Sequence, residues 1–118
     1  MLLNMMKGKI HRAIVTQADL NYEGSITIDE KLAKAAGIVP YEQVSIYDIN
    51  NGSRYTTYCL YGKPDSRTIC LNGAAARMSS VGDLIIIVSY AMIEEELLNE
   101  FKPKIVLVDN DNNIKKIL

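Results

Sequence analysis

Several residue types are scarce in this sequence, and each scarcity narrows what the protein can be. The 118 residues include one histidine, two cysteines and no tryptophan. A single imidazole, His11, nearly excludes a histidine-rich metal centre, and no serine lies close to it in the sequence. Cys59 and Cys70 are too few and too far apart for a disulfide scaffold or a zinc site. We expect both to be small buried hydrophobic side chains.

The sequence also lacks an excess of charge and any long apolar run. Thirteen Lys and Arg residues stand against fourteen Asp and Glu residues, a formal net charge of -1, so a nucleic-acid partner is not expected. The longest uninterrupted apolar run, residues 84–88, is far shorter than the ~20 residues that span a bilayer. The first seven residues are too few for a secretory signal. We therefore expect a cytoplasmic location and no membrane partner.

What is present is typical of a globular protein. Hydrophobic residues make up 48% of the chain and charged residues 23%, which argues against disorder. A chain of 118 residues is most simply one domain, because two domains would each be too small to form a core. We expect a single domain over residues 1–118.

Alternating side chains and turn dipeptides indicate a mainly β protein. Asn51-Gly52 is the strongest hairpin signal, and it lies between strands expected at residues 44–49 and 54–60. The other expected strands are at residues 9–16, 25–28, 68–71, 84–90 and 105–108, while residues 114–118 either pair or fray. Six or so short strands favour a closed or nearly closed barrel, because closure removes exposed edges.

Two short helices are expected to accompany the strands. Asp29 is a suitable N-cap for a helix that ends at Gly37. Apolar residues at helical spacing predict a second helix over residues 94–101, ending before Pro103. On the first strand, regular alternation places one set of side chains on a common face: Lys9, His11, Ala13 and Val15.

Gly24-Ser25, just before the second strand, allows two interpretations. The first is a plain turn ahead of a strand. The second is self-cleavage, because glycine permits strained backbone angles and the Ser25 hydroxyl can then attack the Gly24 carbonyl. That attack converts the peptide to an ester. Elimination frees Gly24 as a new C-terminus, and the dehydroalanine left at position 25 hydrolyses to a pyruvoyl group.

Three blocks of sequence resemble the aspartate 1-decarboxylase family, and they occur in order over most of the chain. The first block consists of Lys9-Ile10-His11-Arg12, Val15-Thr16, Ala18-Asp19-Leu20, Tyr22 and Gly24-Ser25. The second consists of Asn51-Gly52, Arg54 and Thr57-Tyr58. The third consists of Asn72-Gly73-Ala74-Ala75-Ala76 and Gly82-Asp83. Each block alone is a weak signal, but together they are specific.

The resemblance implies a fold, a reaction and an assembly. The fold is a small six-stranded double-psi β-barrel with short helices, assembled as a homotetramer. The proenzyme cleaves itself between Gly24 and Ser25 into chains 1–24 and 25–118. The mature enzyme converts L-aspartate to β-alanine and CO2 for pantothenate synthesis. Its cofactor is the pyruvoyl group made from Ser25, with no metal and no pyridoxal phosphate.

The same resemblance assigns roles to residues whose chemistry suits them. Ser25, as the pyruvoyl group, forms a Schiff base with the substrate amine and withdraws electrons from the carbanion. Tyr58 is the proton donor, since a phenol is protonated at neutral pH. Arg54 binds a substrate carboxylate through both of its oxygens, and Lys9 helps to hold a carboxylate. His11, on the same strand face, has a supporting role.

Further roles follow for the second and third blocks. Thr57 donates a hydrogen bond to the Gly24 carbonyl during cleavage and can also touch substrate. Thr57 and Tyr58 point to opposite faces of a regular strand, so either a bulge re-aims one of them or neighbouring subunits use them differently. Asn72 orients the surroundings of the pyruvoyl group, while Gly73, Ala74 and Ala75 contact substrate through their backbone.

Some alternatives stay open. The chain can be a non-catalytic homo-oligomeric β-barrel that binds a ligand, with Gly24-Ser25 a plain turn. It can also be a pyruvoyl decarboxylase of another amino acid, although glutamate requires a longer pocket. Tyr22 and Tyr47 are expected in the core rather than in the wall of a pocket.

Overall fold

The computed structural model describes residues 1–118, and about half of these residues lie in β-strands. The helical segments are short: α1 (Glu30–Ala35) and the 3₁₀ turns η1 (Gly73–Arg77) and η2 (Glu95–Leu97). None of them is long and apolar enough to cross a membrane. The mainly β prediction is confirmed, with more strands than the six or so expected. The strands are β1 (Leu2–Ile14), β2 (Gln17–Asp19), β3 (Ser25–Asp29), β4 (Gln43–Asp48), β5 (Arg54–Gly62), β6 (Ile69–Asn72), β7 (Leu84–Glu94), β8 (Lys104–Val108) and β9 (Ile114–Ile117).

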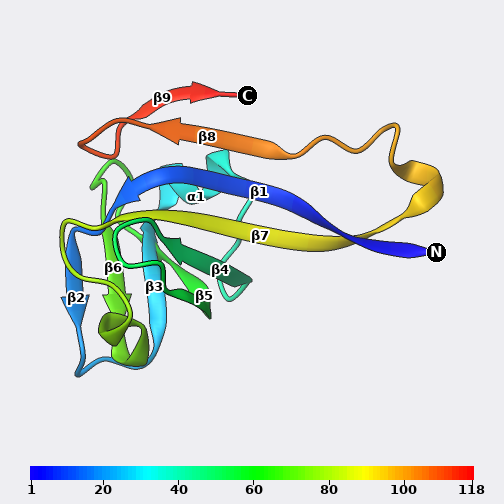
Figure 1. Cartoon of the computed structure of the whole chain (residues 1–118). Helices are drawn as coiled ribbons and strands as arrows, with labels where there is room; N and C mark the ends of the chain where they lie inside the picture. The colour runs from blue at the N-terminus through cyan, green and yellow to red at the C-terminus, as the bar shows by residue number, and fades with distance from the viewer.

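The strands form one hydrogen-bonded array in the order β2-β6-β3-β5-β4-β7-β1-β8-β9 (Figure 1). β1 and β2 lie far apart in this order, yet only Val15 and Thr16 separate them in the chain. The Val15 and Thr16 amides donate to the carbonyls of Asp83 and Ile69, at 3.0 and 2.8 Å. The chain therefore passes from β1, third from one end of the array, to β2 at the other end, although no ladder pairs β1 with β2. Closure into a double-psi barrel stays a prediction.

The core lies between the curved strands and is built largely from β-branched side chains. Fully buried isoleucines alternate with more exposed residues along three strands: Ile26 and Ile28 on β3, Ile46 on β4, and Ile85 and Ile87 on β7. Such alternation buries one face of a strand and leaves the other face free. The opposite face of β3 and β6 carries the polar residues of the site described below, and most of these residues are buried as well.

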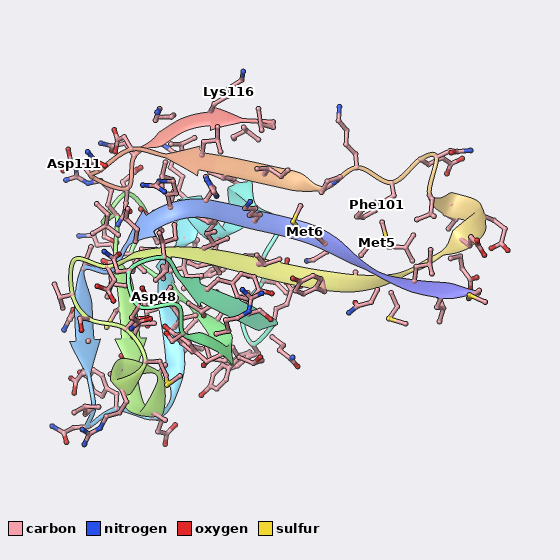
Figure 2. The ribbon with its side chains drawn as sticks, in the orientation of Figure 1. Met5, Met6, Asp48, Phe101, Asp111 and Lys116 are labelled. Carbon is pink, nitrogen blue, oxygen red and sulfur yellow. The ribbon has the colours of Figure 1, made fainter.

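A two-stranded arm extends beyond this body (Figure 1). The antiparallel pairing of β1 with β7 continues outward to Leu2 opposite Glu94. Figure 2 shows Met5 and Met6 on the arm beneath the segment that carries Phe101. The helix predicted at residues 94–101 is wrong: residues up to Glu94 belong to β7, and only the short turn η2 follows. Glu94 pairs with Leu2 on β1, and beyond it the amides of Leu98, Glu100 and Phe101 donate to carbonyls three residues back, as in 3₁₀ turns, so no α-helix forms.

Two local expectations about the chain before residue 40 have opposite outcomes. The predicted helix cap is confirmed, since Asp29 accepts a hydrogen bond from the Lys31 amide and Gly37 has a φ of 72° beyond the helix end. The common face predicted for the first strand is wrong. A register shift lies between Ile10 and Ala13, where Arg12 has a φ of 65°. This bulge turns Ala13 into the core while Lys9 and His11 stay partly exposed.

Candidate active site

The register of β3 and β6 brings four polar or polarisable side chains together. These strands are antiparallel, with Ser25 opposite Asn72 and Thr27 opposite Cys70. Residues two apart on a strand share a face, so all four side chains point to the same side of the sheet. They contribute to one cavity of about 540 Å³, which is lined by Gln17, Tyr22, Glu23, Ser25, Thr27, Tyr58, Leu60, Thr68, Cys70 and Asn72.

A hydrogen-bond network centred on Asn72 holds the Ser25 hydroxyl in this cavity. The Asn72 Nδ2 donates to Ser25 Oγ at 2.9 Å and to Thr27 Oγ1 at 3.0 Å. Its other amide atom, Oδ1, accepts from the Cys70 thiol at 3.3 Å. Ser25 and Asn72 are 1% and 5% exposed. A buried network in which every polar atom has a partner fixes the positions of its members.

The loop before Ser25 packs directly against the residue that follows Asn72. Figure 1 shows the connection from β2 to β3 at the same end of the sheet as η1. Gly73 begins η1 with a φ of 63°, and a Cβ there would lie 2.7 Å from both the Gly24 nitrogen and the Tyr22 carbonyl oxygen. Only glycine allows this approach of backbone to backbone. The Gly24–Ser25 peptide is thereby held beside Asn72 and Gly73.

Tyr58 lines the same cavity from β5, and Thr57 lies elsewhere. The pairing of β4 with β5 runs from Tyr47–Arg54 to Gln43–Tyr58 without a register shift, so no bulge re-aims Thr57. Thr57 instead lines a second, open hollow of about 470 Å³ on the other side of Tyr58. Tyr41 stacks on Tyr58 there, with ring centroids 6.5 Å apart and an angle of 25° between the rings.

Arg54 lies at the start of β5, away from the Ser25 cavity. Its guanidinium carbon is 4.0 Å from the centroid of the Tyr47 ring, within the range of a cation–π contact. The Tyr47 and Tyr90 hydroxyl oxygens are 2.7 Å apart. This hydrogen bond, followed by partial burial, raises the pKa of Tyr90. Two aromatic residues thus support one exposed cation.

Lys9 and His11 also lie outside the Ser25 cavity. His11 lines a separate hollow of about 260 Å³ with Arg12 and Lys115, and its Nδ1 has no hydrogen-bond partner. Burial, followed by the positive charges of Lys9 and Arg12, lowers the pKa of His11. A neutral imidazole is therefore favoured over an imidazolium at neutral pH.

Taken together, the predicted site residues fall into two groups. Ser25, Tyr58 and Asn72 line one cavity; Gly24 and Gly73, which pack against each other, adjoin Ser25 and Asn72 in the chain, and Ala74 and Ala75 follow in η1. The second group, away from that cavity, contains Arg54, Thr57, Lys9 and His11. No lysine, arginine or histidine lines the Ser25 cavity. The chain also contains no cluster of three or more His, Cys, Asp or Glu side chains arranged to hold a metal ion.

Several residues of the site were not expected from the sequence. Cys70 is buried as predicted, but its thiol is a hydrogen-bond donor within the site. Burial, followed by the nearby Asp19 carboxylate, raises the pKa of that thiol and keeps it protonated. Tyr22 was expected in the core but is 62% exposed and lines the cavity, because the loop before β3 lies at the surface. Thr27 lies two residues after Ser25, and Cys70 lies two residues before Asn72. Because residues two apart on a strand share a face, this spacing is the signal that could have identified both.

Comparison with known proteins identifies the family to which this sequence is similar. The sequence profile of a family described as aspartate decarboxylase matches residues 1–115. A protein from Clostridium botulinum named aspartate 1-decarboxylase is 62% identical over 117 residues, covering 99% of this chain and 94% of its own. The enzymes of the same name from Lactiplantibacillus plantarum and Leptospira biflexa are 59% and 53% identical, covering 98% of this chain and 89% and 99% of their own.

Proposed function

The chain belongs to the aspartate decarboxylase family, and from that premise we propose that it removes the α-carboxyl group of L-aspartate as CO2 and leaves β-alanine, in pantothenate biosynthesis. The relatives that carry this name match almost the whole chain at more than half identity. The proposal includes a cytoplasmic, homotetrameric enzyme with a pyruvoyl group and without a metal or pyridoxal phosphate.

The observation that carries the proposal is the Ser25 hydroxyl held beside its own preceding peptide. Asn72 donates to Ser25 Oγ, and Gly73 packs against Gly24 on the other side of that peptide. In the proposed maturation, Ser25 Oγ attacks the Gly24 carbonyl carbon, the C–N bond breaks and an ester forms. Elimination then breaks the Cβ–O bond and releases chain 1–24. Water hydrolyses the dehydroalanine at position 25 and releases ammonia.

The residues around Ser25 fit the pyruvoyl group that the family uses. The Asn72 amide supplies a hydrogen-bond donor at the position that the group occupies, and the adjacent cavity of about 540 Å³ has room for a small amino acid. When present, the group supplies a carbonyl that accepts the electron pair released on decarboxylation. Tyr58, from the same cavity, supplies the proton that completes β-alanine.

A single chain does not offer both halves of the proposed site. Aspartate has two carboxylates, but the cations proposed to bind them, Arg54 and Lys9, do not line the Ser25 cavity. We propose that Arg54 and Lys9 of a second copy complete the site, which is consistent with a homotetramer. Exposed apolar side chains on the arm and η2 support association: Leu2, Met92 and Leu97 are 50%, 57% and 50% exposed.

The test is the mass of the purified protein and its reaction with aspartate. We expect two pieces, residues 1–24 and a fragment from position 25 that borohydride reduction labels at its N-terminus. Ser25→Ala should give one uncleaved chain without activity, because it removes the nucleophile. The control Ser80→Ala, at an exposed turn serine, should cleave as the wild type does. Full activity in protein with an intact Ser25 would disprove the maturation scheme.

The same preparation distinguishes the two alternatives. A chain that stays uncleaved on prolonged warming, and that forms no β-alanine, would support a binding module. Competition between aspartate and glutamate tests the substrate: we expect preference for aspartate. A preference for glutamate would show that the protein is a pyruvoyl decarboxylase of a different amino acid.

A further inference from the structure

We propose that Cys70 is a positioning residue for self-cleavage, because its thiol fixes the orientation of the Asn72 amide that holds the Ser25 hydroxyl. The inference rests on the proposed function, and it concerns a residue that has no role in the scheme above. It follows from three hydrogen bonds on one face of the β3–β6 pair.

The orientation of the Asn72 amide decides what Ser25 can do. With Nδ2 toward Ser25, the amide donates to Oγ and the serine's own proton is free to leave in another direction. In the flipped orientation, the amide oxygen would face Ser25 and Thr27 and accept the protons of both hydroxyls. An amide oxygen is a weak base, so the serine proton would be held where no group removes it. The flipped state is therefore unproductive for attack on Gly24.

The Cys70 thiol distinguishes the two orientations. Its Sγ lies 3.3 Å from Asn72 Oδ1, and it makes the only hydrogen bond donated to that oxygen. In the flipped orientation the NH2 group would face the sulfur, which is only a weak acceptor, and the S–H group would have to turn to the Leu71 carbonyl oxygen at 4.0 Å, so the shorter bond to the amide oxygen would be lost. Cys70 is 6% exposed, so the contact lies in a region of low dielectric, where such a mismatch is costly.

The protonation state of the thiol agrees with this role. Burial and the Asp19 carboxylate raise the pKa of Cys70, so the sulfur carries its proton at neutral pH and acts as a donor. The strand geometry fixes the partner as well, since Cys70 and Asn72 are two residues apart on β6 and share a face. The donor property, rather than the sulfur itself, is what the position requires.

The experiment compares Cys70→Ser with Cys70→Ala in a cell-free synthesis, where cleavage into chains 1–24 and 25–118 is followed by time from the uncleaved chain. Both variants lose the volume of sulfur, but only serine keeps a donor. We expect Cys70→Ala to cleave about three- to tenfold more slowly than the wild type, because that is the change in rate that the loss of one hydrogen bond produces. Cys70→Ser should stay within about twofold of the wild-type rate. Equal slowing of both variants would assign the effect to packing and overturn the proposal, as would Cys70→Ala at the wild-type rate.

A double-mutant cycle with Asn72→Ala tests whether the thiol acts through the amide. Without the amide, adding Cys70→Ala should slow cleavage no further, whereas independent, multiplying effects would overturn the proposal.

Cys59→Ala is the matched control, because it removes the other thiol from the core away from this cavity. Melting temperatures show whether each variant is folded. A folded wild-type chain that never cleaves would overturn the proposed function together with this inference, whereas a cleaving wild type with an equally fast Cys70→Ala chain overturns only the role of Cys70.

Discussion

Two regions of this sheet carry the side chains proposed to act in the reaction, and they differ in how firmly those side chains are held. On the β3–β6 pair, Ser25 and Asn72 are almost fully buried and linked by hydrogen bonds. Near the β4–β5 hairpin, Arg54 is exposed and is supported by the ring of Tyr47, which bonds to Tyr90. One region is a buried polar network, and the other is a surface cation on an aromatic platform.

The difference agrees with the two tasks proposed for these regions. A nucleophile that must attack its own backbone gains from a fixed position, because each misalignment lowers the rate of an intramolecular reaction. A cation that recognises a diffusing carboxylate must meet solvent or a neighbouring molecule before substrate binds. The comparison predicts that changes near β3–β6 block maturation, whereas changes near β4–β5 leave cleavage intact and alter substrate binding.

Among the variants that keep Ser25, the largest effect on self-cleavage is expected for Gly73→Ala. The new Cβ would lie 2.7 Å from the backbone at Gly24 and Tyr22, at a φ of 63° that side chains rarely adopt. Overpacking together with an unfavourable φ should displace the Gly24–Ser25 peptide and slow cleavage by roughly a hundredfold or more. Gly52→Ala is the matched control, since Gly52 has a φ of 77° but nothing within 4 Å of the new Cβ. Gel and mass analysis over time measures both, and equal rates would show that the close packing is unnecessary.

Tyr58→Phe tests a residue that lies between the two regions. Tyr58 lines the Ser25 cavity but belongs to β5, and it has no hydrogen bond to Ser25. We expect normal cleavage and a loss of turnover of about 10²- to 10⁴-fold, the usual contribution of a general acid. Tyr41→Phe, which keeps the stacked ring and loses only a hydroxyl, is the control. Turnover that survives in Tyr58→Phe would remove it as the donor.

The fold was predictable where the local signals and the tertiary contacts agree. The Asn51-Gly52 hairpin and the helix capped by Asp29 both depend on residues close in the sequence, and both are observed. The predicted helix at residues 94–101 failed at its start because Glu94 pairs with Leu2 of β1, at the other end of the chain, and the residues after it form only 3₁₀ turns. Pairing between residues about ninety positions apart leaves no trace in local periodicity.

The site residues were likewise predictable only where their roles do not depend on contacts between strands. The resemblance pointed to Ser25, Tyr58 and Asn72, which the fold brings to one cavity. Cys70 was interpreted as a small hydrophobic residue, because its hydrogen bond needs the Asn72 amide oxygen to face it, and that orientation is accompanied by bonds from the amide nitrogen to Ser25 and Thr27 on the neighbouring strand. The separation of Arg54 from Ser25 could not be read from the sequence either, since it depends on the register of the neighbouring strands β3 and β5, in which Ile26 pairs with Cys59, five residues beyond Arg54.

Arg54→Lys should have a moderate effect, confined to binding. A lysine keeps the positive charge but cannot bind both carboxylate oxygens through a planar fork. We expect KM for aspartate to rise roughly tenfold, because one charge-assisted hydrogen bond is lost. We expect kcat to change little and the rate of self-cleavage to be unchanged. Steady-state kinetics on fully cleaved protein gives the first two values, and the mass time course gives the third. Slower cleavage would show that the two regions are not separate.

Tyr90→Phe is the smallest change and asks whether the aromatic platform under Arg54 needs its outer support. Removing the Tyr90 hydroxyl breaks the 2.7 Å contact with Tyr47, while the Tyr47 ring stays beneath the guanidinium. We expect KM for aspartate to rise about two- to threefold, at the low end for one partly exposed hydrogen bond. Tyr47→Phe removes the same bond from the other side and should give the same increase. If the two variants differ, the Tyr47 hydroxyl has a contact of its own with substrate. If neither changes KM, the ring alone positions Arg54.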